Sequence, residues 1–417
     1  MTETVMLPTT KAQVSGHKFL MRRVEHGVVL GDIRMISDPL GARRRATLFG
    51  LLAVGIIGLG SGAMAMFRPE IDPGDAPIIA AESGALYVRV GHGEAATVHP
   101  VSNLASARLI AGAPEEVAKA SDSVLSQLDR GVPLGIPDAP GLFAPAGTAP
   151  VEWSACQRAK DLQVIAHADH TSVPQPLTEQ QALIAESGGK QWLVTSQGRS
   201  LMPDAKDPLG ASIRRRLDAD PRHPMWRPAP EVLSAVPQLP DLRIPPGELK
   251  LLDAGGDFWW ERPEGIAKLS AVQFEIMRDM GASVRPIERA DLQRYGMSHA
   301  HVDLPTFQPT WVHGQRICVT GETGRVSVAD AELPAGIALS GSSVAHRFSG
   351  LEQGSVGVDT GNGYVLVSEF GVVHRVDTPK DAAALGLVEP KKAPWRILRL
   401  LPEGSELSRS AAARAGY

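Results

Sequence analysis

The chain has 417 residues, of which 43% are apolar and 21% are charged, so a packed core is expected and wholesale disorder is excluded. Its 42 glycines and 33 prolines predict many turns and extended linkers, and its length predicts roughly two to four domains. The net charge of −4 argues against a general nucleic-acid binder, and two cysteines are too few for a disulfide scaffold. Residues 1–45, in contrast, carry a net charge of +4.

The N-terminal segment Lys18–Asp38 is mostly compatible with a helix, which the dipeptide Asp38-Pro39 would end. Its apolar residues recur at intervals of four or multiples of four: Leu20, Val24, Val28 and Ile36. Two interpretations stay open. The segment is either a small amphipathic helix on a membrane surface or a docking surface for a cytoplasmic partner.

Residues 46–67 form a run of 22 residues without a charge. As a helix this run is about 33 Å long, which is enough to cross the hydrocarbon core of a membrane. The arginines at positions 43–45 precede it, so we expect a cytoplasmic N-terminus, a single pass through a membrane and an extracytoplasmic remainder. The alternatives are a buried core helix and a signal peptide cleaved after the small-x-small sequence Ala63-Met64-Ala65, although the run is long for a signal peptide.

On this topology Cys156 and Cys318 lie in an oxidising compartment. One pair of cysteines there is most simply one disulfide, which would close a loop of about 160 residues and stabilise the fold by roughly 4–5 kcal/mol in the chain-entropy model. Two buried free thiols are the alternative. Both cysteines lie in or beside strand-like runs, so a bond between them would mark a central β domain.

A short strand, a tight turn, a second strand and a helix start recur four times, with anchor residues Leu86, Trp192, Phe258 and Tyr364. The predicted helix starts are Asn103, Asp207-Pro208, Ser270 with a capping box to Gln273, and Thr378-Pro379. The anchors are 106, 66 and 106 residues apart, which predicts two outer and two inner repeats around a central element. Chance similarity among hairpins is the alternative.

These features predict an α+β protein: a single N-terminal transmembrane helix, then an extracytoplasmic region with a central β-rich domain and four small hairpin-helix repeats. The expected divisions are a basic cytoplasmic segment (1–45), the membrane helix (46–67), a membrane-proximal segment with repeat 1 (68–130), a linker and the first part of the central domain with Cys156 (131–185), repeat 2 (186–220), a proline-rich linker (221–250), repeat 3 (251–290), the second part of the central domain with Cys318 (291–355), repeat 4 (356–390) and a C-terminal tail (391–417).

A search for catalytic motifs finds no P-loop, GxSxG elbow or HExxH. The nearest approach to a P-loop is Gly188-Gly189-Lys190-Gln191, which lacks the Ser or Thr after the lysine and has Ile184 in place of the first glycine. Two histidine clusters are weak metal candidates that ordinary solvated loops explain equally well: His299, His301 and Asp303, and His167, Asp169 and His170. We therefore predict no catalytic, cofactor or metal residues, and only the cysteine pair as a site.

Several stretches together give the chain a family resemblance. It resembles EccB, a membrane component of the actinobacterial type VII (ESX) secretion system, in the residues 22–26, 32–35, 38–40, 74–79, 83–90, 99–101, 103–110 and 135–137 and in the single cysteine after Trp153. The match is most specific over residues 20–160.

The resemblance implies one helix in the cell inner membrane and an extracytoplasmic (periplasmic) region in which four small repeats surround a central β domain that contains a disulfide. It also implies assembly with the EccC motor ATPase and the EccD and EccE membrane subunits, association of neighbouring copies outside the membrane, and passage of secreted protein substrates. Family members are often labelled ATPases, but the missing phosphate loop leaves enzymatic activity open. A structural subunit of the secretion complex is therefore the expected function, with an extracytoplasmic nucleotide or cell-wall hydrolase and a cell-wall-binding module as alternatives.

Overall fold

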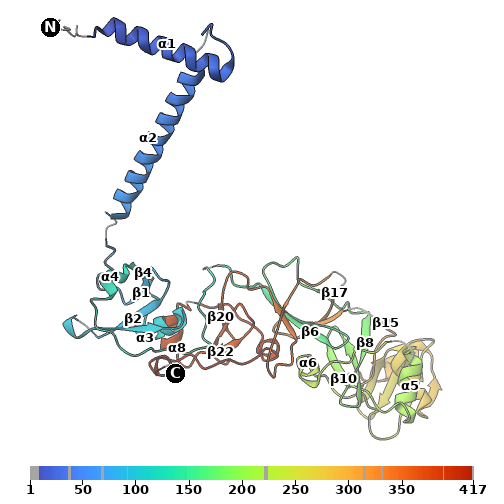
Figure 1. Cartoon of the computed structure of the whole chain (residues 1–417). Coiled ribbons are helices and arrows are strands. Elements are labelled where there is room, and N and C mark those ends of the chain that lie inside the picture. Colours follow the sequence, from blue (N-terminus) through green and yellow to red (C-terminus); the bar gives the residue numbers. More distant parts are fainter. Residues whose placement is uncertain are drawn as a thin grey trace, which may run out of the picture. The chain divides into compact units, whose positions relative to one another are not determined.

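The computed structural model describes residues 9–35, 39–66, 70–91, 93–145, 147–219, 224–312, 316–329, 332–387 and 389–415 (Figure 1). The chain divides into two compact units, Met1–Glu70 and Ile71–Tyr417. The described residues of the first unit form two helices, and those of the second form five β-sheets with short helices.

Helix α1 (Lys11–Leu30) begins earlier than the predicted segment Lys18–Asp38. The side-chain oxygen of Thr10 accepts a hydrogen bond from the backbone N–H of Gln13, and the Gln13 side chain accepts one from the backbone N–H of Thr10. This reciprocal pair is a capping box, which fixes the helix start. Gly31 then ends the helix in a left-handed conformation with a φ of 70°, so the predicted continuation past this residue is wrong.

Helix α2 (Pro39–Met66) contains the uncharged run predicted at residues 46–67. It starts before that run because proline is favourable at the first helical position and the arginines that follow are good helix formers. The predicted helix stop at Asp38 and the end of the run at Phe67 lie outside the described residues. The part Gly41–Met64 is long and apolar enough to cross a membrane, and none of it is buried.

The first sheet of the second unit has the strand order β3-β2-β1-β4. Its elements are β1 (Ile78–Ala81), β2 (Leu86–Val90), η1 (Gly93–Ala95), β3 (Thr97–Val101), α3 (Leu104–Ala111), β4 (Ala118–Ala120) and α4 (Asp122–Leu125). Helix α3 starts where predicted, because the Asn103 side chain accepts a hydrogen bond from the Ser106 backbone N–H. The sequence did not predict strand β1, which precedes the hairpin β2–β3, or the parallel edge strand β4.

Two further four-stranded sheets follow, with the orders β10-β9-β8-β15 and β13-β12-β11-β14. The first contains β8 (Gln181–Ser187), β9 (Lys190–Thr195), β10 (Gly198–Leu201), α5 (Pro208–Arg216) and β15 (Thr310–Trp311). The second contains β11 (Lys250–Asp253), β12 (Phe258–Arg262), β13 (Gly265–Leu269), α7 (Ala271–Asp279), β14 (Ser283–Pro286) and η2 (Arg289–Arg294). Both helices begin at their predicted N-caps, and the capping box at the start of α7 is confirmed.

A three-stranded sheet near the C-terminus consists of β20 (Val356–Asp359), β21 (Tyr364–Val367) and β22 (Val373–Arg375), and it is followed by α8 (Pro379–Leu385). Thr378 caps α8 as predicted, since its side chain accepts a hydrogen bond from the Asp381 backbone N–H. The helices α9 (Trp395–Leu398) and α10 (Arg409–Ala412) complete the chain.

The remaining sheet has seven strands in the order β18-β19-β6-β5-β16-β17-β7. Its strands are β5 (Glu152–Arg158), β6 (Asp161–His167), β7 (Gln175–Pro176), β16 (Arg316–Thr320), β17 (Arg325–Ala329), β18 (Ile337–Ala338) and β19 (Arg347–Ser349). They come from the two ranges expected to form the central domain. The boundaries at residues 186 and 291 need correction, however. Strand β8 starts within the first of these ranges and β15 lies within the second, but the two strands pair with each other in parallel, in the sheet that also contains β9.

Two sheets have apolar residues on both faces, because strand side chains alternate between faces. In β21, Leu366 belongs to the core shared with α3, while Val365 and Val367 belong to the core of the seven-stranded sheet. In β9, Leu193 belongs to the core shared with α7, while Val194 again faces the seven-stranded sheet. These two sheets therefore each join the central sheet to one further sheet.

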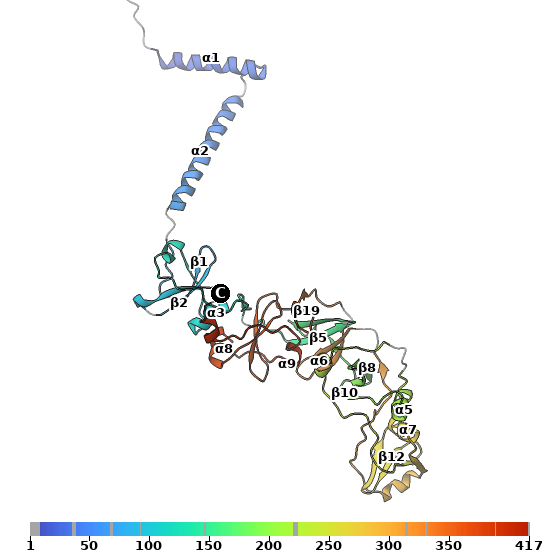
Figure 2. The ribbon, with the colours of Figure 1, turned by 60° about the horizontal axis from the view of Figure 1, so that its bottom comes forward.

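Two segments expected to be linker or tail are integral to the fold. The proline-rich range 221–250 contains α6 (Pro230–Ser234), whose Val232 and Leu233 are buried in the core of the seven-stranded sheet. The described residues of this range are therefore part of the packed fold and not a free linker. The described residues 391–415 are likewise no free tail, because α9 packs on β5 (Figure 2) and α10 packs on α3.

The buried side chain of Leu407 tests the role of the C-terminal segment. It is fully buried in the core shared by α3 and α8, so Leu407→Ala should lower the free energy of unfolding by about 2–5 kcal/mol. Denaturant titration followed by tryptophan emission measures this, since all seven tryptophans lie beyond residue 70. The exposed neighbour in Glu406→Ala should change the value by less than about 0.5 kcal/mol, and equal effects would contradict the packing.

Candidate assembly surfaces

The sheet β3-β2-β1-β4 (the first sheet) and the three-stranded sheet β20-β21-β22 (the fourth sheet) are held together by their helices. Helix α3 packs against both α8 and α10, and the shared core combines Ile78, Val88 and Leu109 with Leu366 and Leu385. A sheet with one short helix cannot bury its apolar face alone, so each sheet supplies the cover that the other lacks. Figure 2 shows α3 and α8 side by side.

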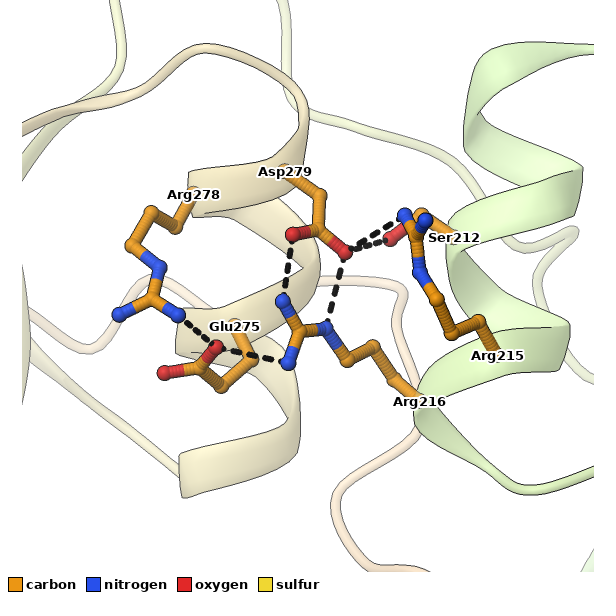
Figure 3. A network of polar contacts seen from close by, with 6 residues as sticks. All are labelled: Ser212, Arg215, Arg216, Glu275, Arg278 and Asp279. Atoms are coloured by element: carbon orange, nitrogen blue, oxygen red, sulfur yellow. Dashed lines mark hydrogen bonds and ion pairs between the residues drawn. The ribbon is translucent and has the colours of Figure 1, made fainter.

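The sheet β10-β9-β8-β15 (the second sheet) and the sheet β13-β12-β11-β14 (the third sheet) form a similar pair through α5 and α7, which pack on each other. A polar network crosses their contact (Figure 3). Both carboxylate oxygens of Asp279 accept hydrogen bonds from the Arg216 guanidinium, with Nε 2.8 Å from Oδ2. Oδ2 also accepts bonds from Ser212 Oγ at 2.7 Å and Arg215 Nη2 at 3.1 Å, while Arg216 Nη1 lies 2.9 Å from Glu275.

This geometry shifts the titration of the central carboxyl group. The hydrogen bond from Arg216 is the largest cause that lowers the pKa of Asp279 far below its usual range, and the bond from Ser212 and the charge of Arg215 act in the same direction. Desolvation opposes the shift without overcoming it. The carboxylate therefore stays ionised at every physiological pH and holds the two helices together by charge-assisted bonds.

The predicted cysteine pair lies in the middle of the seven-stranded sheet. Cys156 on β5 stands directly opposite Cys318 on β16 in the antiparallel register, and a disulfide joins them. Both side chains are buried. Since the two residues are 162 positions apart, the bond ties together strands that a long stretch of chain separates.

A buried serine–histidine pair lies beside this disulfide. Ser154 Oγ is 2.6 Å from Nε2 of His167, and Nδ1 of the same ring is 3.1 Å from Ser172 Oγ. Burial lowers the pKa of His167, which favours the neutral imidazole. Ser154 is fully buried, so no substrate can reach it and the pair serves to satisfy polar groups within the sheet.

Neither histidine cluster is arranged as a metal site. The residues His299–Asp303 lie in a loop rather than a strand, and Asp303 accepts a hydrogen bond from Arg243 Nε at 3.0 Å. The His301 side chain is 86% exposed, at the rim of a groove of about 670 Å³. In the other cluster Asp169 caps a turn by bonding Thr171 and Ser172. Within the described ranges, no group of three or more potential metal ligands is found.

The sequence nearest to a phosphate-binding loop forms a hairpin turn. Gly188 and Gly189, with φ values of 60° and 73°, connect β8 to β9, and a strand follows them rather than a helix. Positive φ at both central positions is typical of a type I′ turn. The turn lacks the helix N-terminus that binds phosphate in a P-loop, so it does not support nucleotide binding there.

The N-terminal unit presents two different surfaces. Leu20, Val24 and Val28 form an apolar stripe on α1 and are all well exposed. At about 100° per residue, Arg22 and His26 lie on the opposite side of the helix, where α1 meets the start of α2. The sequence pattern predicted this stripe together with Ile36, which lies outside the described residues. The contact between the two helices was not predicted. The start of α1 was also placed too late, although the capping box at Thr10 marks it.

The charged contact between α5 and α7 makes a direct prediction. Asp279→Asn should lower the free energy of unfolding at pH 7 by about 1–2 kcal/mol, because charge-assisted hydrogen bonds across the contact are lost. The folded protein binds the Asp279 proton more weakly than the unfolded chain does. The stabilisation is therefore fully present above the unfolded carboxyl pKa of about 4 and declines as the pH falls below it.

Unfolding titrations at pH 7 and at acidic pH measure both effects. The matched control is Asp291→Asn, which removes an exposed ion pair with Arg294 in the same sheet region and should have little effect. If the free energy of unfolding at pH 7 falls no more for Asp279→Asn than for the control, the role of this contact is refuted.

Similar proteins cover nearly the whole chain. EccB1 of Mycobacterium tuberculosis, named an ESX-1 secretion system ATPase, is 27% identical over 466 residues and covers 97% of this chain and 94% of its own length. EccB3 of Mycolicibacterium smegmatis, named an ESX-3 secretion system ATPase, is 29% identical over 474 residues, which cover 97% of this chain and 90% of that protein.

Solved structures agree with these relatives. A chain of an intact ESX-5 inner membrane complex superposes with a TM-score of 0.65 and 25% identity, covering 99% of this chain and 96% of that chain. A chain of the EccB3 dimer from the ESX-3 core complex gives a TM-score of 0.66 and 25% identity, covering 82% of this chain and 100% of that one. The family model described as type VII secretion system ESX-1, transport TM domain B matches residues 6–256 and 337–416. The chain therefore belongs to the EccB family of type VII secretion membrane components.

Proposed function

We propose that this chain is a single-pass scaffold subunit of an ESX inner membrane complex, with residues 1–45 in the cytoplasm and residues 71–417 outside the inner membrane. The observation that carries the proposal is α2. It is uncharged from Ala46 onward, and its described side chains are exposed, with three arginines before that run. Such a helix is stable in lipid, and basic residues are retained on the cytoplasmic side.

The extracytoplasmic unit fits a scaffold better than an enzyme. Its four helix-covered sheets, which we interpret as four repeats, pair first with fourth and second with third around the seven-stranded sheet. Repeats of this kind offer several similar surfaces for contacts with neighbouring subunits. The EccB3 relative was solved as a dimer, which supports association of this chain with further copies through the same region.

The apolar stripe on α1 supports partners on the cytoplasmic side. Leu20, Val24 and Val28 face away from the contact with α2 and are exposed, at 59%, 63% and 81%. Within the inner membrane complex we expect this stripe to contact another membrane subunit, with the EccC motor, EccD and EccE as the candidates. Burial against the membrane surface is the competing outcome.

Nucleotide hydrolysis receives no support from the fold, although relatives carry the word ATPase in their names. The glycine pair at 188 and 189 is a hairpin turn, and the serine–histidine pair is closed to solvent. We therefore assign the chain an assembly role, in which secreted proteins pass through a complex that it helps to form.

Labelling from outside tests the orientation. Ser15→Cys in α1 and Ser342→Cys in the extracytoplasmic unit introduce one exposed thiol each. An impermeant maleimide applied to cells with an intact inner membrane should label the Ser342→Cys protein directly and the Ser15→Cys protein only after lysis. The reverse pattern, or equal labelling of both, would overturn the proposed topology.

The native cysteines provide a separate test of the compartment. We expect the protein isolated from cells to contain no free thiol at Cys156 and Cys318, because they face each other in an oxidising environment. The C156A/C318A variant should unfold more easily by roughly 4–5 kcal/mol on the chain-entropy model, and reduction of the wild type should have the same effect. Two free thiols in freshly isolated protein would contradict this assignment.

A further inference from the structure

A basic hollow lies where α1 meets the start of α2. It has a volume of about 240 Å³ and is lined by Arg22, Glu25, His26, Gly41, Arg44, Arg45 and Leu48. The three residues from α1 lie on one face, at positions i, i+3 and i+4, and the four from α2 also share one face, at i, i+3, i+4 and i+7. The two faces meet, so the hollow belongs to the helix contact itself.

Local contacts hold the walls of this hollow in place. The guanidinium of Arg44 forms an ion pair with the Glu25 carboxylate and so connects the two helices. Arg45 Nε donates a hydrogen bond to the backbone oxygen of Gly41 at 3.2 Å. The His26 side chain is only 3% exposed and forms part of the contact. Several donors are therefore positioned before any ligand arrives.

The charge of the lining favours an anion. Three arginines face one glutamate, which leaves a formal excess of two positive charges with histidine neutral. Guanidinium groups are suited to phosphate, because their planar donors match two phosphate oxygens at once. A phosphate group is the anion that this set of donors recognises best.

The position of the hollow identifies the source of the phosphate. Leu48 lines it and is itself part of the uncharged run, in which Phe49, Leu51 and Leu52 are also exposed. The hollow thus opens at the level where charged residues give way to lipid-facing ones. A ligand there meets arginines at one end and an apolar helix surface at the other, which is the layout of a phospholipid.

We propose that Arg22, Arg44 and Arg45 bind the phosphate of an anionic phospholipid headgroup, whose acyl chains lie along α2 beyond Leu48. The proposal rests on the proposed function insofar as α2 must lie in a membrane. A bound lipid would fix α1 against α2 at the membrane surface and thereby orient the apolar stripe of α1 towards its partner.

Native mass spectrometry of the full-length protein released from nanodiscs tests the site. With mixed phosphatidylglycerol and phosphatidylcholine, the wild type should retain phosphatidylglycerol at least about fivefold in excess of its share, and R22Q/R45Q should lose this preference. The matched control R34Q/R43Q removes the same charge at exposed arginines outside the hollow and should retain it. The variant R22K/R45K keeps the charge and should retain part of the preference.

Three results would overturn the proposal. Equal losses in R22Q/R45Q and R34Q/R43Q would indicate diffuse charge rather than a site, and equal retention of both lipids by the wild type would indicate no selectivity. Displacement of the lipid by millimolar inorganic phosphate or glycerol phosphate would identify a site for soluble phosphate.

Unchanged tryptophan emission in every variant shows that the second unit remains folded, since it contains all the tryptophans.

The same samples separate this proposal from the proposed function. If the chain fails to enter nanodiscs at all, the membrane anchor is wrong. If the chain enters nanodiscs but shows no selective lipid retention, only the lipid site is wrong.

Discussion

The rest of the molecule depends on one constraint: the apolar surface of α2 cannot remain in water. Twenty-two consecutive residues carry no charge, and the apolar span within Gly41–Met64 is not buried by any other part of the described chain. Burying a side chain such as Leu or Ile is worth about 1.5–3 kcal/mol, so insertion of this helix into lipid, as proposed, would stabilise it by far more than any single contact elsewhere. The helix belongs to the first of the two compact units, Met1–Glu70.

A second constraint makes the large unit cohesive. The second and fourth sheets have apolar residues on both faces, so each is covered on one side by the seven-stranded sheet and on the other by a partner sheet. Alternation along β21, where Leu366 faces one core and Val365 and Val367 face another, shows how one strand serves both contacts. A scaffold needs this kind of continuity, because it must keep its outer surfaces in fixed positions while neighbouring subunits bind.

Sequence reasoning succeeded where the signals are local. The capping residues Ser270 and Thr378 gave correct helix starts, because capping is decided within four residues. The anchor helix was recognisable from composition alone. The start of α1 was not predicted, because the regular apolar spacing begins only at Leu20, well after the capping box formed by Thr10 and Gln13.

The rest could not be predicted because it depends on distant partners. Strand β15 has two residues and pairs with β8 more than a hundred positions earlier, and no local pattern indicates such a register. The bond between Arg216 and Asp279 is similar, because many arginines and carboxylates are available and only the packing of α5 on α7 selects this pair. The helix α6 was obscured by prolines that mark a linker in general but here include the first residue of a short buried helix.

The intact mass of the protein extracted from membranes tests the central claim most directly. The account predicts that α2 is retained, so the measured mass should correspond to a chain that still contains residues 46–67 and the basic segment before them. The protein should also stay with the membranes in alkaline carbonate. A mature protein that begins near Met66 and is found in the soluble fraction would contradict the anchored scaffold.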